Sequence, residues 1–122
     1  MAAKNETKSG IDLELASRIL RIVPLPEAFL FFTDIGQYTG EFAQCLADFS
    51  EKLHKVSLKS LEFHFERGDF ERWIKEILGD EYLTDEISKI DRAIRGEELR
   101  STIQGIVKNR LDQLKAATMT NT

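Results

Sequence analysis

The chain of 122 residues is poor in cysteine and proline and has no long apolar run. A single cysteine, Cys45, excludes an intramolecular disulfide and fits a reducing cytoplasm. Its apolar neighbours predict a buried side chain rather than a reactive thiol. No segment approaches the roughly 20 apolar residues that span a bilayer, and residues 1–10 lack the apolar core of a secretion signal. These absences predict a cytoplasmic protein that has no membrane partner.

Positive charge is also in short supply, with 17 Lys and Arg against 21 Asp and Glu and a net charge of −4. Nucleic-acid binding depends mostly on neutralising phosphates, so this balance disfavours a nucleic-acid partner. The C-terminal third is richer in basic residues, but acids stand among them at helical spacing. Asp91 with Arg95, and Lys108 with Asp112, predict paired surface charges rather than a basic patch.

Apolar residues recur at spacings of three and four along most of the chain, which indicates amphipathic helices. We expect helices at about 11–22, 40–56, 57–67 and 70–78, another that carries Leu83 to Ile94, and a last one at 97–116. Residues 26–33 are dense in Phe, and both a short helix and an extended segment are open for them because periodicity cannot separate the two over so few residues. No obvious second strand is present, which favours a helix or an irregular apolar segment for residues 26–33.

The fold predicted from this pattern is all-α, a single-domain bundle or array of five to six helices. Residues 11–116 would form the domain, and residues 1–10 and 117–122 would be disordered tails. Two abrupt Gly-Asp corners join the helices. Gly68 suits the left-handed position that ends one helix, Asp69 can cap the next, and Gly79-Asp80 repeats the arrangement.

The candidate functional residues gather at the first corner: His64, Glu66, Asp69 and Trp73. An imidazole beside a carboxylate is a common catalytic pair and a common structural one. Because His64 lies between two Phe just before a helix break, we predict that it hydrogen-bonds across the Gly68 turn, and we assign no catalytic residue.

Metal binding has one weak signal, the Glu-x-x-His spacing of Glu51 and His54. Di-metal helical bundles use two such motifs together with two further Glu. Glu62 and Glu66, one turn apart, could share a cation or form a solvated acidic face. We assign no metal ligand and no cofactor.

The segment from Ser60 to Ile74 (SLEFHFERGDFERWI), followed by Leu78-Gly-Asp80, resembles an uncharacterised family of small prokaryotic domains, many of them archaeal. The resemblance extends over about residues 26–115. It implies no activity, but it marks His64, Asp69 and Trp73 for testing.

Two functions are compatible with these observations. The preferred hypothesis is a non-catalytic helical domain for protein interaction or regulation. The apolar stripes of the last helices are open to two interpretations, burial within the monomer or pairing with a partner protein or a second copy. The alternative is a small-molecule or metal-binding domain, even an enzyme, centred on His64, Glu66, Asp69 and Trp73. Burial of these groups in a hydrogen-bonded corner favours the first hypothesis, and an open cleft that holds them favours the second.

Overall fold

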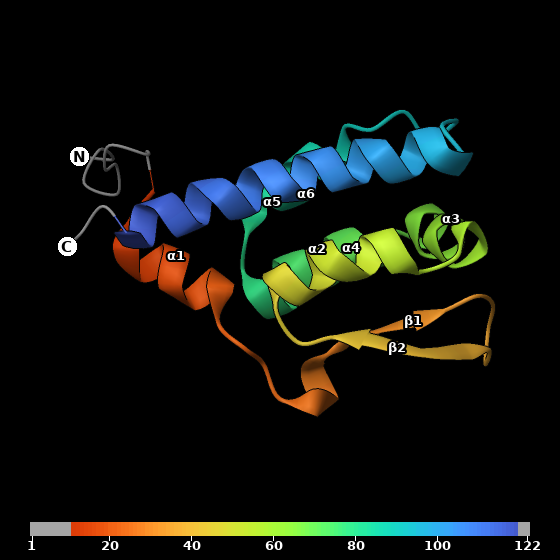
Figure 1. The fold of residues 1–122 in the computed structure, drawn as a ribbon, viewed down its shortest axis with the longest axis horizontal. Helices are drawn as coiled ribbons and strands as arrows, with labels where there is room; N and C mark the ends of the chain where they lie inside the picture. Colours follow the sequence, from red (N-terminus) through yellow and green to blue (C-terminus); the bar gives the residue numbers. More distant parts are fainter. Residues whose placement is uncertain (1–10, 120–122) are drawn as a thin grey trace.

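The computed structural model describes residues 11–119, which form a mostly helical domain with one small antiparallel sheet (Figure 1). The α-helices are α1 (Leu13–Leu20), α2 (Leu46–Lys55), α3 (Leu58–Arg67), α4 (Asp69–Trp73), α5 (Glu81–Ser88) and α6 (Gly96–Met119). A 3₁₀ turn, η2 (Leu25–Glu27), precedes strands β1 (Phe29–Phe32) and β2 (Tyr38–Ala43), and a π-helical turn, η3 (Ile74–Leu78), extends α4. The fold is therefore largely helical, but the all-α prediction is wrong because of this sheet.

The sheet replaces the start of the helix predicted at 40–56. Its register pairs Phe29 with Ala43 and Leu30 with Phe42. The Phe42 side chain fits the spacing of the helix that follows, but in the structure it belongs to the strand, and α2 begins only at Leu46. Residues 29–32 are extended and pair with β2, so the preference for a helix or an irregular segment there was wrong.

The elements stack in layers, with α6 on one side, α2 and α3 in the middle, and the two strands on the other side (Figure 1). α6 contacts α1, α2, α3 and α5, while β1 packs on α3 and β2 on α2. Aromatic side chains fill the space between the strands and the helices. The fully buried rings there are Phe31, Phe49 and Phe70, and all three contact the ring of Phe29.

The two glycine corners are present as predicted. Gly68 has φ of +74° and Gly79 has φ of +81°, both in the left-handed region. Asp80 caps α5 by accepting a hydrogen bond from the Leu83 N–H at 3.1 Å. The prediction for Asp69 is wrong: it is the first residue of α4, its side chain makes no capping bond, and Gly68 occupies the capping position.

The helix predicted to carry Leu83 to Ile94 ends earlier, at Ser88. Turns follow up to Gly96, where α6 begins and where the backbone N–H donates to Glu62 Oε2 at 2.7 Å. α6 continues to Met119, past the predicted end at residue 116, and buries Ala117. Of the predicted tails, residues 1–10 and 120–122 lie outside the described part of the chain.

A buried ion pair joins α6 to the second corner. Arg110 Nε lies 2.8 Å from Asp80 Oδ2, and Nη2 lies 3.0 Å from Oδ1. Both side chains are buried, so the pair is bidentate and shielded from water. Within residues 11–119, no helix combines the length and the apolar character that a membrane span requires.

Candidate binding site

His64 holds two parts of the chain together at the first corner. It projects from α3 and is buried, with 3% of its surface exposed. The backbone N–H of Phe32 donates to its Nε2 at 2.8 Å, and its Nδ1 lies 2.8 Å from Asp69 Oδ2. An acceptor nitrogen carries no proton, so the neutral ring is protonated on Nδ1 and donates to Asp69. Both ring nitrogens are therefore occupied.

The pKa shifts agree with a neutral imidazole beside an ionised carboxylate. Burial lowers the pKa of His64, against the opposing effects of the hydrogen bond to Asp69 and its negative charge. Burial alone would raise the pKa of Asp69, but hydrogen bonds from His64, Arg72 and Arg67 outweigh it and lower that pKa. At neutral pH the corner is thus held by hydrogen bonds to one carboxylate.

Ser60 completes the contact between α3 and the strand. Its hydroxyl donates to the Phe32 carbonyl oxygen at 2.7 Å. Ser60 and His64 stand one turn apart on α3, so they share a face and together bind both backbone groups of Phe32. Within the described residues, β1 pairs only with β2, and helix side chains therefore bind backbone groups that a further strand would otherwise take.

Trp73 lies at the other end of β1 and is also buried. Its Nε1–H donates to the Glu27 carbonyl oxygen at 2.8 Å, and its ring lies 5.7 Å from that of Phe29, edge to face. Glu66 does not join this group. Its carboxylate is exposed and forms an ion pair with Arg95 at 3.0 Å. The structure brings together three of the four predicted residues and leaves Glu66 on the surface.

A cavity of about 460 Å³ opens between the strand and the corner. Its apolar lining comes from both sides and consists of Phe29, Leu30, Phe32, Ile35, Phe63, Trp73 and Ile77. The charged groups on it are Asp34, Arg67, Asp69, Arg72 and Glu76. His64 and Gly36 complete the lining. The lining residues of β1 and the hairpin turn were not identified from the sequence. Their position depends on the sheet, which was not predicted because the apolar spacing around Phe42 indicated a helix.

Two half-exposed arginines stand on this cavity and share one carboxylate. Arg67 Nε lies 3.0 Å from Asp69 Oδ2, and Arg72 donates from Nη2 to Oδ1 of the same residue. About half of each arginine side chain is exposed, 48% and 50%, while only 16% of the Asp69 side chain is. Asp69 therefore fixes both guanidinium groups at the edge of the cavity.

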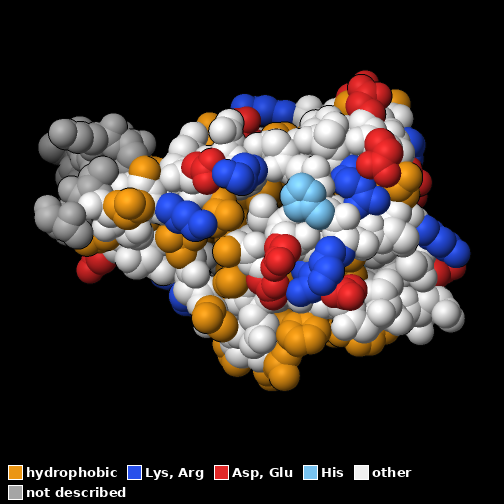
Figure 2. Space-filling model, viewed as in Figure 1, with side chains coloured by type: hydrophobic (Ala, Val, Ile, Leu, Met, Phe, Trp, Pro, Cys, Tyr) orange, Lys and Arg blue, Asp and Glu red, His pale blue; other side chains and the backbone are white. Residues whose placement is uncertain are grey.

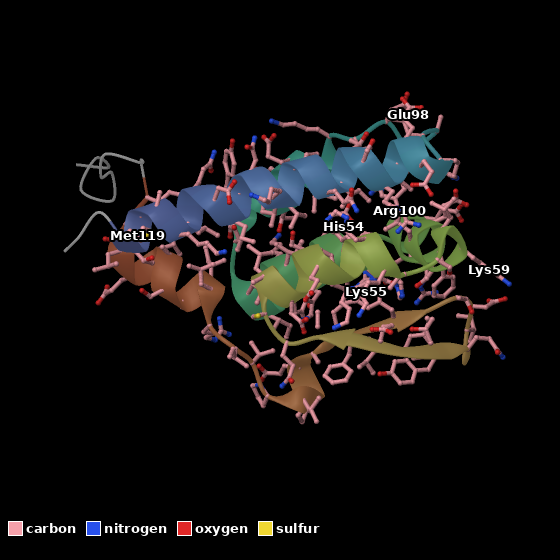
Figure 3. All side chains as sticks on the ribbon, in the orientation of Figure 1. His54, Lys55, Lys59, Glu98, Arg100 and Met119 are labelled. Carbon is pink, nitrogen blue, oxygen red and sulfur yellow. The ribbon has the colours of Figure 1, made fainter. Side chains whose placement is uncertain are left out.

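The other residues singled out in the sequence have separate partners. His54 Nδ1 lies 2.8 Å from Gln104 Nε2 and faces α6 (Figure 3), while Glu62 binds the start of α6. Cys45 directly precedes α2. Its side chain is half-buried, which is less than the burial predicted for it. Among residues 11–119, no three His, Cys, Asp or Glu side chains lie close enough to hold a metal ion.

The basic residues of the C-terminal third largely bind within the domain. Arg100 donates to the carbonyl oxygens of Leu53 and Val56 at 2.7 and 2.8 Å, where α2 ends (Figure 3). Lys108 pairs with Asp112 as predicted, whereas Arg95 pairs with Glu66 instead of Asp91. Acidic and basic side chains alternate on the face shown in Figure 2. The visible surface therefore has no extended basic patch.

Comparisons of the chain with models of protein families, with curated proteins and with solved structures gave no match. The resemblance to a family of small prokaryotic domains stays a prediction, and the function is inferred from the geometry of the site alone.

Proposed function

We propose that the protein is a non-catalytic interaction domain that binds an apolar side chain of a protein partner in the cavity beside the Gly68 corner. The observation that carries the proposal is the combination of an open, largely apolar cavity with polar side chains engaged inside the domain. At protein interfaces, a few apolar or aromatic anchor side chains commonly fill such pockets on the partner.

The contacts of His64 support a structural role for the corner. A general base needs a free lone pair within reach of a substrate proton. The lone pair on Nε2 accepts the Phe32 N–H, and Nδ1 is committed to Asp69. Catalysis by this imidazole would first have to break its bond to β1.

Exposed apolar side chains at the cavity favour a partner larger than a metabolite. Leu30 is 41% exposed and Ile35 is 70% exposed, and both line the cavity. They extend the apolar lining onto the surface around it. A partner that inserts one side chain into the cavity could cover them with its neighbouring residues, as interface anchors commonly do.

A small-molecule binding domain is the second candidate. The open cavity lined by His64, Asp69 and Trp73 favours it, as expected from the sequence for such a domain, and so does the size of the cavity. A volume of about 460 Å³ falls within the range of roughly 300–1,000 Å³ that is typical of ligand pockets. The centre would then be His64, Asp69 and Trp73 with the apolar residues of β1, and Glu66 would have no part in it because it lies on the surface.

Selection of binding peptides from a randomised displayed library tests the proposal. We expect the immobilised domain to enrich peptides that share an aromatic or large aliphatic residue, and we expect their binding to change the fluorescence of Trp73, the sole tryptophan of the chain. Ile35→Ser should weaken binding. Ile22→Ser is the matched control, because Ile22 is 74% exposed and does not line the cavity.

Absence of any enriched peptide would contradict the proposal. So would peptides whose binding is equally strong in the Ile35→Ser and Ile22→Ser variants, because the cavity would then have no part in recognition. If an apolar small molecule binds in the cavity and no peptide does, the second candidate replaces the first.

A further inference from the structure

We propose that the cavity selects a peptide segment in which an acidic residue stands directly beside the apolar anchor, with Arg67 and Arg72 receiving its carboxylate. This inference rests on the proposed function and specifies the chemistry of the partner. Its basis is an arginine pair on the rim of the apolar cavity whose donors are only partly used.

The two guanidinium groups converge on a single acid. Asp69 accepts from Arg67 on Oδ2 and from Arg72 on Oδ1, and it also accepts from His64. Each arginine carries five N–H donors, and the contact with Asp69 uses Nε of Arg67 and Nη2 of Arg72. Two positive charges thus face one negative charge at this point of the cavity, and further donors on half-exposed side chains can bind a second carboxylate.

Both arginines are held in place before a ligand arrives. The Arg67 guanidinium lies over the ring of Phe63, 5.1 Å from its centroid. Arg72 Nη2 lies within 3.4 Å of the carbonyl oxygen of Arg67. A pre-ordered guanidinium loses less conformational entropy on binding a carboxylate than a freely moving one.

Two acids on the same cavity, Asp34 and Glu76, oppose a general attraction for anions. They come from different segments, the hairpin turn and η3, and Asp34 Oδ1 accepts the Ile35 N–H at 2.7 Å. Both arginines pair with Asp69, and within the described residues neither forms an ion pair with Asp34 or Glu76. Selection should depend on direct contact with the arginines, because neither the lining nor the chain, with its net charge of −4, is positive as a whole.

Four blocked tetrapeptides test this inference on the full chain. They are Ac-Gly-Glu-Phe-Gly-NH2, its Gln-Phe and Lys-Phe analogues, and Ac-Gly-Glu-Ala-Gly-NH2, each titrated to millimolar concentration and followed by Trp73 fluorescence and by amide chemical shifts. The Glu-Phe peptide should bind about tenfold more tightly than the Gln-Phe peptide, in keeping with a hydrogen-bonded ion pair. The Glu-Ala peptide should bind more weakly than either.

Arg72→Gln is the informative variant, and Arg95→Gln is its control because Arg95 pairs with Glu66 and does not line the cavity. Arg72→Gln should abolish the preference for Glu-Phe over Gln-Phe, and its amide chemical shifts away from the cavity show that the variant is folded. Arg95→Gln should keep the preference.

The outcomes separate this inference from the proposed function. Equal binding of Glu-Phe and Gln-Phe, or strongest binding of Lys-Phe, overturns the selection for an acid while an apolar anchor is still bound. Preference that persists in Arg72→Gln also overturns it. Absence of binding by every Phe-containing peptide contradicts the proposed function itself.

Discussion

The backbone N–H of Phe32 donates a hydrogen bond to Nε2 of His64, over a distance of 2.8 Å and a separation of 32 residues. This bond connects the strand that lines one side of the cavity to the corner that lines the other. It also determines where the imidazole proton is, because an accepting nitrogen cannot carry it. The geometry of the cavity and the chemistry of His64 are therefore coupled.

Stability should fall as the pH drops below about 6.5. The pKa of His64 in the folded protein is lowered from 6.5 by burial, so in this range the unfolded chain takes up a proton that the folded protein does not. The contribution of the neutral His64 to the free energy of unfolding is fully present above the pKa of the unfolded state. It is lost progressively as the pH falls to the pKa of the folded state. Urea unfolding from pH 7.5 to 5.0 measures it.

Two variants assign this pH dependence to one imidazole. His64→Gln should unfold more easily at pH 7.5 and should lose less stability on acidification than the wild-type protein. His54→Gln, which changes the other histidine of the chain, is the parallel control. A slope that disappears in His54→Gln and persists in His64→Gln would contradict the assignment.

Asp69→Ala should lower the free energy of unfolding by about 1–3 kcal/mol, because it leaves the buried Nδ1–H of His64 without an acceptor. Asp112→Ala is the matched control. Asp112 pairs with Lys108 on the exposed face of α6, where such pairs contribute about 0–1 kcal/mol. Equal effects of the two substitutions in chemical denaturation would show that Asp69 is a surface charge rather than the centre of the corner.

Removing Asp80 should cost about 3–5 kcal/mol, because Arg110 would keep a buried charge without a partner. The Asp80→Ala variant also loses the cap of α5. Replacing Arg110 by Met in the same chain should restore part of the stability, since no unpaired charge then remains. If the double variant is less stable than Asp80→Ala, the ion pair is not the cause.

Two glycine substitutions should change the stability of the domain in opposite directions. Gly79→Ala should destabilise by about 1 kcal/mol or more, because φ is +81° and the new Cβ would lie 2.6 Å from Arg18 Nη2. Gly105→Ala, within α6 and with open space around its Cβ position, should stabilise by about 0.5–1 kcal/mol. Thermal unfolding of both variants compares them directly, and equal shifts would contradict the left-handed corner at Gly79.

Local signals in the sequence predicted the parts of the fold that depend on neighbouring residues. Gly68 and Gly79 end helices in the left-handed conformation, as expected. The bond between His64 and Asp69 across the Gly68 turn is present for the same reason, since only five residues separate the two. Backbone geometry at a tight turn is set by the residues of the turn.

Pairing over longer distances was not predictable in this way. Phe42 continues the apolar series of α2 and is therefore read as helical, although it pairs with Leu30 in the sheet. Asp69 could have capped α4, but three donors from His64, Arg67 and Arg72 bind its carboxylate instead. The cavity depends on both contacts. Three of the residues that line it were therefore identified from the sequence, but the cavity was not predicted.

The protonation state of His64 tests the central claim most directly, namely that its imidazole is a structural clamp rather than a free chemical group. Nitrogen-15 NMR of the full chain at pH 7.5 should show a neutral ring protonated on Nδ1, with a scalar coupling across the bond from the Phe32 N–H to Nε2. A ring protonated on Nε2, or a charged imidazolium without that coupling, would contradict the account and return His64 to the set of groups available for catalysis.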